Sequence, residues 1–314
     1  MSVLRVSVLL GGLAAIAACS PLQVLNLTAH TSGLSTEANI SYGGKYRQQL
    51  NIYSINNSPT GETEEKRPVI IFFYGGSWKT GNRADYLFVA ERLAELGYIV
   101  VVPDYRTYPE VSFPGFIEDG ALAVKWVFEN IRQFGGNEKQ IFLAGHSAGA
   151  HIASMLAFNR QYLRDAGAAT IAVKGVIGLA GPYAFRPSRT KSIAPIFAHL
   201  KNENIARPIS FVDGKAPPML LLHGASDTTV GRFNSDQMAA AIGRSGGTAT
   251  KIIYPKIGHI GILLALSRPF KNKAPALKDI ATFINRQISK KMPAQGDEID
   301  PIELLPFAEV AAQQ

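Results

Sequence analysis

The sequence predicts an α/β fold with a mostly parallel central sheet flanked by helices, and three observations support this. Continuous apolar runs such as 69–74 and 98–102 are typical of strands that are buried on both faces. Segments with helical periodicity, among them 84–96 and 119–134, separate such runs. The alternation of the two indicates right-handed βαβ units, which place their strands parallel in one sheet.

The elements can be justified in chain order. Residues 40–55 alternate in polarity, most clearly at 49–53, and predict a strand pair. Residues 56–67 hold Asn, Ser, Pro, Thr and Gly followed by charges, and we expect a surface loop there. From Pro68 onward the chain alternates between strands and helices. Besides the runs above, the predicted elements are strands at 140–144, 173–179, 219–222 and 250–254 and helices at 150–158, 233–245 and 276–290.

The composition indicates one large domain. The chain has 314 residues, of which 46% are hydrophobic and 18% charged, and this is enough apolar content for a single large core. It contains neither an internal repeat nor a low-complexity linker in its middle. We expect the domain to span 40–291, with a cap-like insertion at 186–218 and a poorly ordered tail at 292–314.

The chain is basic, with a net charge of +8. Its Lys and Arg residues are scattered, with modest concentrations at 186–201 and 268–291. Because no basic stripe alternates with aromatic residues and no nucleic-acid motif is present, we do not expect nucleic acid as a partner. A solvated basic surface is the first interpretation, and attraction to anionic lipid headgroups or polysaccharide is the second.

The N-terminus holds the one cysteine of the chain, Cys19. Arg5 supplies a positive charge, and the apolar run 6–18 is too short to cross a bilayer. The run ends in I-A-A-C, which resembles a bacterial lipobox, although a secretory signal or a buried cysteine would be alternatives. We expect 1–18 to be a signal peptide and 19–39 a lipid-anchored tether. Ser20 after the cysteine suggests the outer membrane, with the protein facing the periplasm or the exterior.

A serine stands at the centre of the pentapeptide Gly145–Gly149, G-H-S-A-G. The pentapeptide joins a predicted strand to a predicted helix, and at such a junction G-x-S-x-G forms a sharp turn. The turn lifts the serine above the sheet, with the N-terminus of the helix behind it. A loop that merely turned the chain would explain neither the apolar strand nor the spacing of the glycines. We therefore predict Ser147 as a nucleophile.

A serine nucleophile needs a base in hydrogen-bond reach and a carboxylate that orients the base. Functional groups of α/β sheets gather beyond the carboxyl ends of the strands. Asp227 follows the predicted strand 219–222, and His259 follows 250–254, so we predict these two as the partners of the serine. Their order along the chain, Ser, Asp, His, is one that triads on a parallel α/β sheet use.

Other acidic and histidine residues fit these roles less well. We expect His146 and His151 to point away from the serine and His223 to be structural. The remaining alternatives are Asp213 in the insertion, Asp236 within a helix, and His30 and His199 without a supporting context.

A glycine-rich turn, Tyr74–Trp78, follows the first predicted parallel strand. Such a turn can direct backbone N–H groups at a substrate carbonyl, and one donor of this kind is typically worth about 10² to 10³ in rate. We predict an oxyanion hole formed by the N–H groups of Gly76, Ser77 and Ala148. An ordinary Gly-Gly turn is the alternative.

Together these motifs resemble the α/β-hydrolase superfamily, close to its hormone-sensitive-lipase-like and feruloyl-esterase-like carboxylesterases. The resemblance covers about residues 42–290. It implies hydrolysis through a serine acyl-enzyme without a cofactor or metal. The family usually has His where Tyr74 stands and often Gly where Ser77 stands, which puts the support of the turn in question. The segments that carry the resemblance are 74–78, 104–106, 134–137, 145–149, 223–227 and 258–259.

We expect a carboxylic ester hydrolase that acts on small-molecule esters with short acyl chains, because the insertion 186–218 is too short to build a large lid. Two alternatives stay open. Aryl formamidases have a similar glycine turn, H-G-G-x-W, and would hydrolyse an amide. A catalytically silent binding protein could also use this scaffold. Nothing in the sequence points to an oligomeric state.

Overall fold

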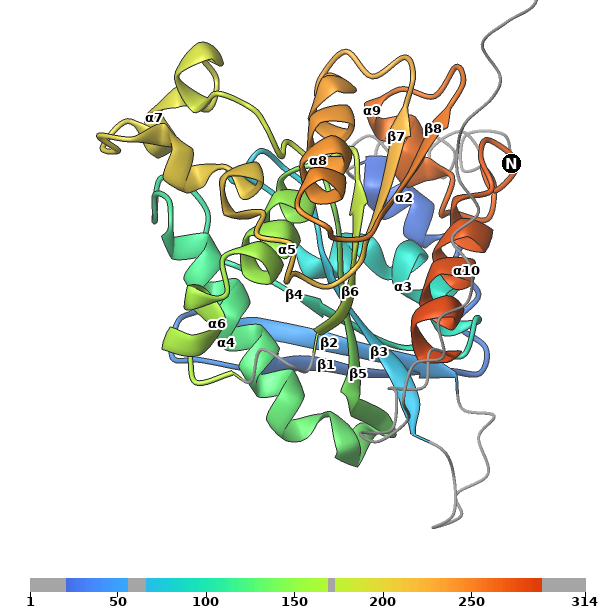
Figure 1. Ribbon diagram of the computed structural model, residues 1–314. Coiled ribbons are helices and arrows are strands. Elements are labelled where there is room, and N and C mark those ends of the chain that lie inside the picture. The colour runs from blue at the N-terminus through green and yellow to red at the C-terminus, as the bar shows by residue number, and fades with distance from the viewer. Residues whose placement is uncertain (1–20, 56–65, 169–172, 290–314) are drawn as a thin grey trace, which may run out of the picture.

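The computed structural model describes residues 21–55, 66–168 and 173–289, and its centre is one sheet (Figure 1). Within these residues eight strands pair in the order β1-β2-β4-β3-β5-β6-β7-β8. The strands are β1 (Leu34–Ser41), β2 (Gln49–Ile55), β3 (Arg67–Phe73), β4 (Ile99–Pro103), β5 (Gly136–His146), β6 (Val173–Leu179), β7 (Met219–Gly224) and β8 (Ala249–Tyr254).

The pairing confirms the predicted fold class. β2 is antiparallel to both β1 and β4, and every later pair is parallel. The middle strands form the core, since β4 is buried along its whole length and β7 likewise. The predicted strand at 173–179 coincides with β6, whereas the strand predicted at 140–144 extends in both directions to become β5.

Helices cover both faces of the sheet. In Figure 1, α4 and α5 lie on one side of it and α3 and α10 on the other. The α-helices are α2 (Pro21–Asn26), α3 (Leu87–Ala94), α4 (Gly115–Asn130), α5 (Ala148–Phe158), α6 (Gln161–Asp165), α7 (Ala194–Phe197), α8 (Phe233–Arg244), α9 (His259–Leu264) and α10 (Ala276–Ser289). The 3₁₀ turns are η1 (Arg83–Tyr86), η2 (Ile131–Phe134), η4 (Pro187–Arg189), η5 (Glu203–Ala206) and η6 (Pro208–Phe211).

The structure differs from the expected tether at its C-terminal part. Residues 34–41 form β1, an outer strand of the sheet, and residues 21–26 form the short helix α2. Leu25 is buried, and the side chain of Asn26 accepts a hydrogen bond from the N–H of Phe88 at 3.1 Å. The folded domain therefore includes residues 21–39. The predicted signal peptide, Cys19 and the tail 292–314 lie outside the described residues.

The insertion 186–218 connects β6 to β7 and contains η4, α7, η5 and η6. It packs on the domain through aromatic rings: the ring of Phe197 lies 5.3 Å from that of Trp78 and 5.7 Å from that of Phe185, centroid to centroid. Aromatic pairs at this separation add to the stabilisation that burial supplies. The insertion is thereby fixed beside the glycine turn that contains Trp78.

Candidate active site

Ser147 stands between β5 and α5 with φ 54° and ψ −120°, a conformation that L residues rarely adopt. The flanking glycines make this turn possible. A Cβ on Gly149 would lie 1.9 Å from the carbonyl oxygen of Phe73, and one on Gly145 would lie 2.4 Å from the carbonyl carbon of Gly149. Only glycine fits at either place, so the G-x-S-x-G spacing is a steric requirement of the turn.

The structure brings the three predicted side chains into one hydrogen-bonded line. His259 Nε2 lies 2.9 Å from Ser147 Oγ, and His259 Nδ1 lies 2.8 Å from Asp227 Oδ2. The side chain of Asp227 is fully buried, and that of His259 is 10% exposed. This is the geometry that a base needs in order to take a proton from a hydroxyl while a carboxylate holds its ring.

The loops after β7 and β8 are joined to each other, which explains how Asp227 meets His259. The N–H of Ala225 donates to the carbonyl of Tyr254 at 2.9 Å, and the N–H of Ser226 donates to that of Ile257 at 2.9 Å. Because β7 and β8 are parallel neighbours, their carboxyl ends lie at the same edge of the sheet. The two loops then continue as one hydrogen-bonded unit.

Asp227 stays charged in this buried position. Its Oδ1 accepts hydrogen bonds from the N–H groups of Thr229 and Val230, both at 2.9 Å. Burial alone would raise the pKa of Asp227, but hydrogen bonds from His223 and His259 outweigh it. The pKa therefore lies well below its usual range, and the site holds a carboxylate at neutral pH.

His223 is a second histidine on the same carboxylate, a contact that could not be predicted from the sequence. Its Nε2 lies 3.3 Å from Asp227 Oδ2 and 2.8 Å from the carbonyl oxygen of Val230, while its Nδ1 lies 2.8 Å from Ser235 Oγ. Both neighbours of Nε2 are acceptors, so the proton sits on Nε2, and Nδ1 accepts from the Ser235 hydroxyl. The ring is fully buried, which agrees with the expected structural role.

His146 does not point away from the site as expected. Its ring centroid lies 4.8 Å from that of His259, and its Nε2 lies 3.0 Å from the carbonyl oxygen of His259. Burial, together with the nearby His259, lowers the pKa of His146 to about 3. The ring is therefore neutral and donates from Nε2 to this carbonyl. His146 ends β5, so its position at a strand end was the signal that could have revealed it.

His151 instead points to the insertion. Its Nε2 lies 2.8 Å from the carbonyl oxygen of Ala206 in η5, and burial lowers its pKa to about 4. The neutral ring donates this hydrogen bond, and it packs edge-on against Trp78 at 5.1 Å. His151 therefore ties the insertion to α5, one turn beyond the serine.

The glycine turn lies against the serine with unused N–H donors. Gly76 has φ +129°, a conformation that favours glycine, and its carbonyl accepts from the N–H groups of Lys79 and Thr80. In the described part of the chain, no hydrogen bond is donated by the N–H groups of Gly76, Ser77 or Ala148. Ala148 is also the first residue of α5, where an N–H has no partner within the helix.

Tyr74 supports this turn in place of the usual histidine. It is fully buried, and its ring stacks between those of Tyr105 at 4.7 Å and Tyr86 at 5.3 Å. Burial raises the pKa of its hydroxyl, so the proton is retained. The hydroxyl donates to Asp104 Oδ1 at 2.7 Å and accepts from Arg47 Nη2 at 2.8 Å. Tyr74, which stands where the family usually has histidine, is thus anchored by hydrogen bonds to Asp104 and Arg47.

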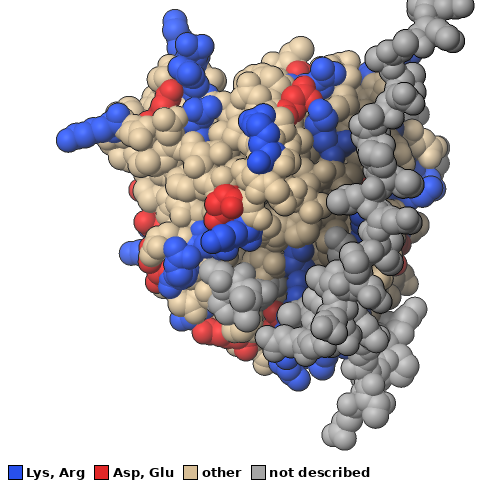
Figure 2. Space-filling model, in the orientation of Figure 1, with Lys and Arg blue, Asp and Glu red and all other residues tan. Residues whose placement is uncertain are grey.

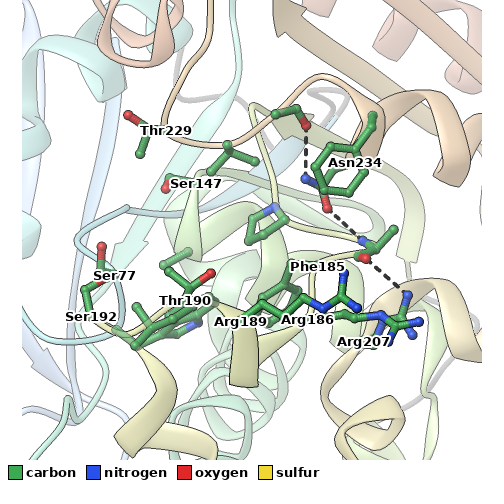
Figure 3. A pocket seen from close by; sticks show the side chains of 18 of the residues that line it. Ser77, Ser147, Phe185, Arg186, Arg189, Thr190, Ser192, Arg207, Thr229 and Asn234 are labelled. Atoms are coloured by element: carbon green, nitrogen blue, oxygen red, sulfur yellow. Dashed lines mark hydrogen bonds between the residues drawn. The ribbon is translucent and has the colours of Figure 1, made fainter.

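A pocket of about 490 Å³ opens beside the serine (Figure 3). Ser77, Ser147 and Ala148 line it together, which places the predicted nucleophile and two of the predicted donors in one cavity. Its volume lies within the range of small-molecule sites, about 300–1,000 Å³. Among the residues that the structure describes, no group of three or more His, Cys, Asp or Glu could hold a metal ion.

The sheet order and the serine turn define the α/β-hydrolase class of protein. Within that class, the model of the BD-FAE family matches residues 50–242, and the chain belongs to this family. The family match confirms the resemblance that the motifs indicated.

Curated relatives are named as esterases. Esterase LipQ of Mycobacterium tuberculosis is 31% identical over 273 residues, which cover 81% of this chain and 64% of that protein. Isoprenylcysteine alpha-carbonyl methylesterase ICME of Arabidopsis thaliana is 29% identical over 255 residues, covering 72% of this chain and 56% of that protein. The chain thus spans 56% to 64% of the length of these two relatives.

Solved structures share the fold. An esterase from Pyrobaculum calidifontis is similar with a TM-score of 0.68 and 23% identity, over 85% of this chain and 90% of that one. Esterase B from Lactobacillus rhamnosis, inhibited by a tributyrin phosphonate, is similar with a TM-score of 0.73 and 18% identity, over 91% of this chain and 96% of that one.

Proposed function

We propose that this protein is a serine carboxylic ester hydrolase that acts through an acyl-enzyme. The observation that carries the proposal is the hydrogen-bonded line from Ser147 Oγ through His259 to Asp227. Its serine end lines a pocket. The esterases among its relatives support the same activity.

The reaction follows from the positions of these groups. His259 Nε2 takes the proton of Ser147 Oγ as the oxygen attacks the ester carbonyl, and Asp227 stabilises the imidazolium that forms. His259 then gives the proton to the departing alcohol, which leaves an acyl group on Ser147. In the second half a water molecule loses a proton to His259 and attacks this acyl group. The bond from the acyl carbon to Ser147 Oγ then breaks, His259 returns the proton to Oγ, and the acid is released.

Negative charge develops on the carbonyl oxygen in both halves. The N–H groups of Gly76, Ser77 and Ala148 have no other partner in the described structure, and we assign them to this oxyanion. Because the turn is held by Tyr74 and by its own hydrogen bonds, the donors need no rearrangement when the charge appears. Each such donor is worth about 10² to 10³ in rate.

We assign the enzyme to esters with short acyl chains, from acetyl to about hexanoyl. The pocket of about 490 Å³ suits a small ester, and the insertion beside it consists of short turns and one helix of four residues. The shortness of these elements supports a short acyl chain, because a long chain would need a deeper enclosure to be buried along its length.

A fluorophosphonate probe and 4-nitrophenyl acetate test the activity. Wild-type protein should be labelled and should hydrolyse the ester, whereas folded Ser147→Ala should do neither. Ser210→Ala, which changes an exposed serine in η6, is the matched control and should behave like wild type. Turnover by folded Ser147→Ala close to that of wild type would overturn the proposal. Faster hydrolysis of N-formylkynurenine than of any ester would replace it with the formamidase activity.

We also propose that the protein is an outer-membrane lipoprotein, anchored through Cys19. The support is the sequence alone: a basic residue, a short apolar run and the I-A-A-C motif. Two or three acyl chains on the cysteine would anchor it stably, since one chain gives only marginal binding. In the residues that the structure describes, we find no helix of the length and apolarity needed to cross a bilayer.

A further inference from the structure

The pocket beside Ser147 has an unusual charge. Three arginines line it, Arg186, Arg189 and Arg207, and its lining includes neither Asp nor Glu. Figure 3 shows the arginines along one side of the pocket, with Ser147 and Thr229 across from them. An ester that reaches Ser147 therefore enters a space whose charged side chains are all positive.

Two of the three arginines, Arg186 and Arg189, make no direct contact with an acceptor in the described structure. Arg207 is held in place, since its Nη1 donates to Asn204 Oδ1 at 2.7 Å and its Nη2 to the carbonyl of Ala184 at 3.1 Å. In the described structure, the guanidinium groups of Arg186 and Arg189 make neither a hydrogen bond nor an ion pair, and both side chains are exposed. Their guanidinium N–H groups are therefore available to an incoming group.

Glu203, an acid near these arginines, is hydrogen-bonded to a residue of its own. Glu203 lies outside the pocket lining, and its carboxylate accepts from the hydroxyl of Ser188 at 2.8 Å and from its N–H at 3.2 Å. These hydrogen bonds lower the pKa of Glu203, and Arg186 and Arg207 contribute. The carboxylate of Glu203 is thus already bonded to Ser188, and it lies within the electrostatic reach of Arg186 and Arg207. Figure 2 shows Lys and Arg side chains projecting from the part of the molecule that carries α7.

Apolar side chains also line the pocket. Trp78 and Phe185 are buried, and their rings stack at 5.7 Å between centroids. Ile193, in the insertion 186–218, also lines the pocket. Phe233, at the start of α8, lines the pocket while 49% exposed. An apolar body can pack on these side chains while an attached anion reaches the arginines.

We propose that Arg186 and Arg189 form an anion-binding subsite, and that the preferred substrates are esters with a free carboxylate attached to an apolar acyl or alcohol part. The inference rests on the proposed esterase activity and names its substrate class. A guanidinium group matches a carboxylate with two parallel hydrogen bonds, and an arginine-lined pocket raises the local concentration of anions.

Matched pairs of esters test the subsite. The acyl-side pair is 4-nitrophenyl hydrogen adipate and neutral 4-nitrophenyl hexanoate, and the alcohol-side pair is 3-carboxyphenyl acetate and phenyl acetate. Arg186→Gln and Arg189→Gln should each lower kcat/KM for the charged ester of at least one pair by about two- to fivefold, the usual range for an exposed ion pair. Neutral esters should be hydrolysed as by wild type.

Two controls sharpen the test. Arg244→Gln removes the same charge at an exposed position outside the pocket and should change neither ester of a pair. Raising the salt concentration should shrink the preference of wild type for the charged ester, because ions screen exposed charges.

The outcomes separate the two proposals. If wild type hydrolyses the neutral esters but the double variant of Arg186 and Arg189 affects charged and neutral esters equally, the subsite is wrong and the esterase activity stands. If wild type hydrolyses neither ester of either pair, the esterase activity fails and the subsite falls with it. A dependence on the arginines in one pair alone supports the subsite and tells which side of the ester carries the carboxylate.

Discussion

Replacement of Asp227 by asparagine gives the sharpest prediction, because the two carboxylate oxygens face different partners. Oδ1 accepts from the backbone N–H groups of Thr229 and Val230, both at 2.9 Å. Oδ2 lies 2.8 Å from His259 Nδ1 and 3.3 Å from His223 Nε2. The side chain is fully buried, so its orientation is set by these contacts.

Asparagine must keep an oxygen opposite the two backbone N–H groups, since an amide NH₂ would place donor against donor there. The NH₂ group then occupies the position of Oδ2 and donates to His259 Nδ1. The imidazole proton moves to Nε2, which faces Ser147 Oγ and can no longer accept the proton of the hydroxyl. We expect kcat to fall on the order of 10⁴-fold, or about 5.5 kcal/mol of transition-state stabilisation.

The assay is steady-state hydrolysis of 4-nitrophenyl acetate, with thermal unfolding to show that Asp227→Asn is folded. Asp236→Asn is the matched control: this residue pairs near the surface with Lys251 and Arg232, and its variant should retain full kcat. Ser147→Ala should cost more than Asp227→Asn, because it removes the nucleophile itself. Folded Asp227→Asn with kcat within tenfold of wild type would refute the assignment of the tautomer and of the triad.

Three further predictions concern the turn, the pocket and the N-terminus. Tyr74→Phe removes a buried hydroxyl that bonds to Asp104, and should lower the free energy of unfolding by about 1–3 kcal/mol in urea titration. Tyr46→Phe, at a tyrosine that is 91% exposed, should leave it unchanged, and equal effects of the two would contradict the anchor. Across a series of 4-nitrophenyl esters, kcat/KM should peak between acetate and hexanoate, and a maximum at palmitate would reject the short-chain assignment. Cys19→Ala should move the protein from the membrane to the soluble fraction, with mass spectrometry of the wild-type N-terminus as the check; an unmodified N-terminus would leave only a secretory signal.

The parallel part of the sheet could be predicted from the sequence because its strands are buried. Strands such as β6 and β7 are apolar runs, and the helices between them keep a 3.6-residue period. The start of β1 could not be predicted from the sequence, because β1 is an outer strand whose residues 36–39 are exposed. Its place in the sheet depends on backbone hydrogen bonds to β2, which leave no apolar pattern in the sequence.

In the site, too, some residues could be predicted from the sequence and others could not. Ser147, Asp227 and His259 could be predicted because each follows a strand, and parallel strands end at one edge. That Arg186 and Arg189 line the pocket depends on how the insertion packs around Trp78 and Phe197. Such packing is tertiary, and the sequence indicated only that basic residues concentrate there.

In the described structure, three histidines lie around Ser147 and Asp227, and His259 is the one that we propose as the base. His146 directs its Nε2 to the carbonyl of His259, and its pKa of about 3 keeps it neutral, so it adds no charge beside the imidazolium. His223 directs its Nε2 to Asp227 and Val230. The Nε2 of His259 faces the hydroxyl of Ser147, which lines the pocket, whereas the Nδ1 of His223 accepts from Ser235, which is buried outside the pocket lining. The two other rings contact the groups around this base, since His146 bonds to the backbone carbonyl of His259 and His223 lies against the carboxylate of Asp227.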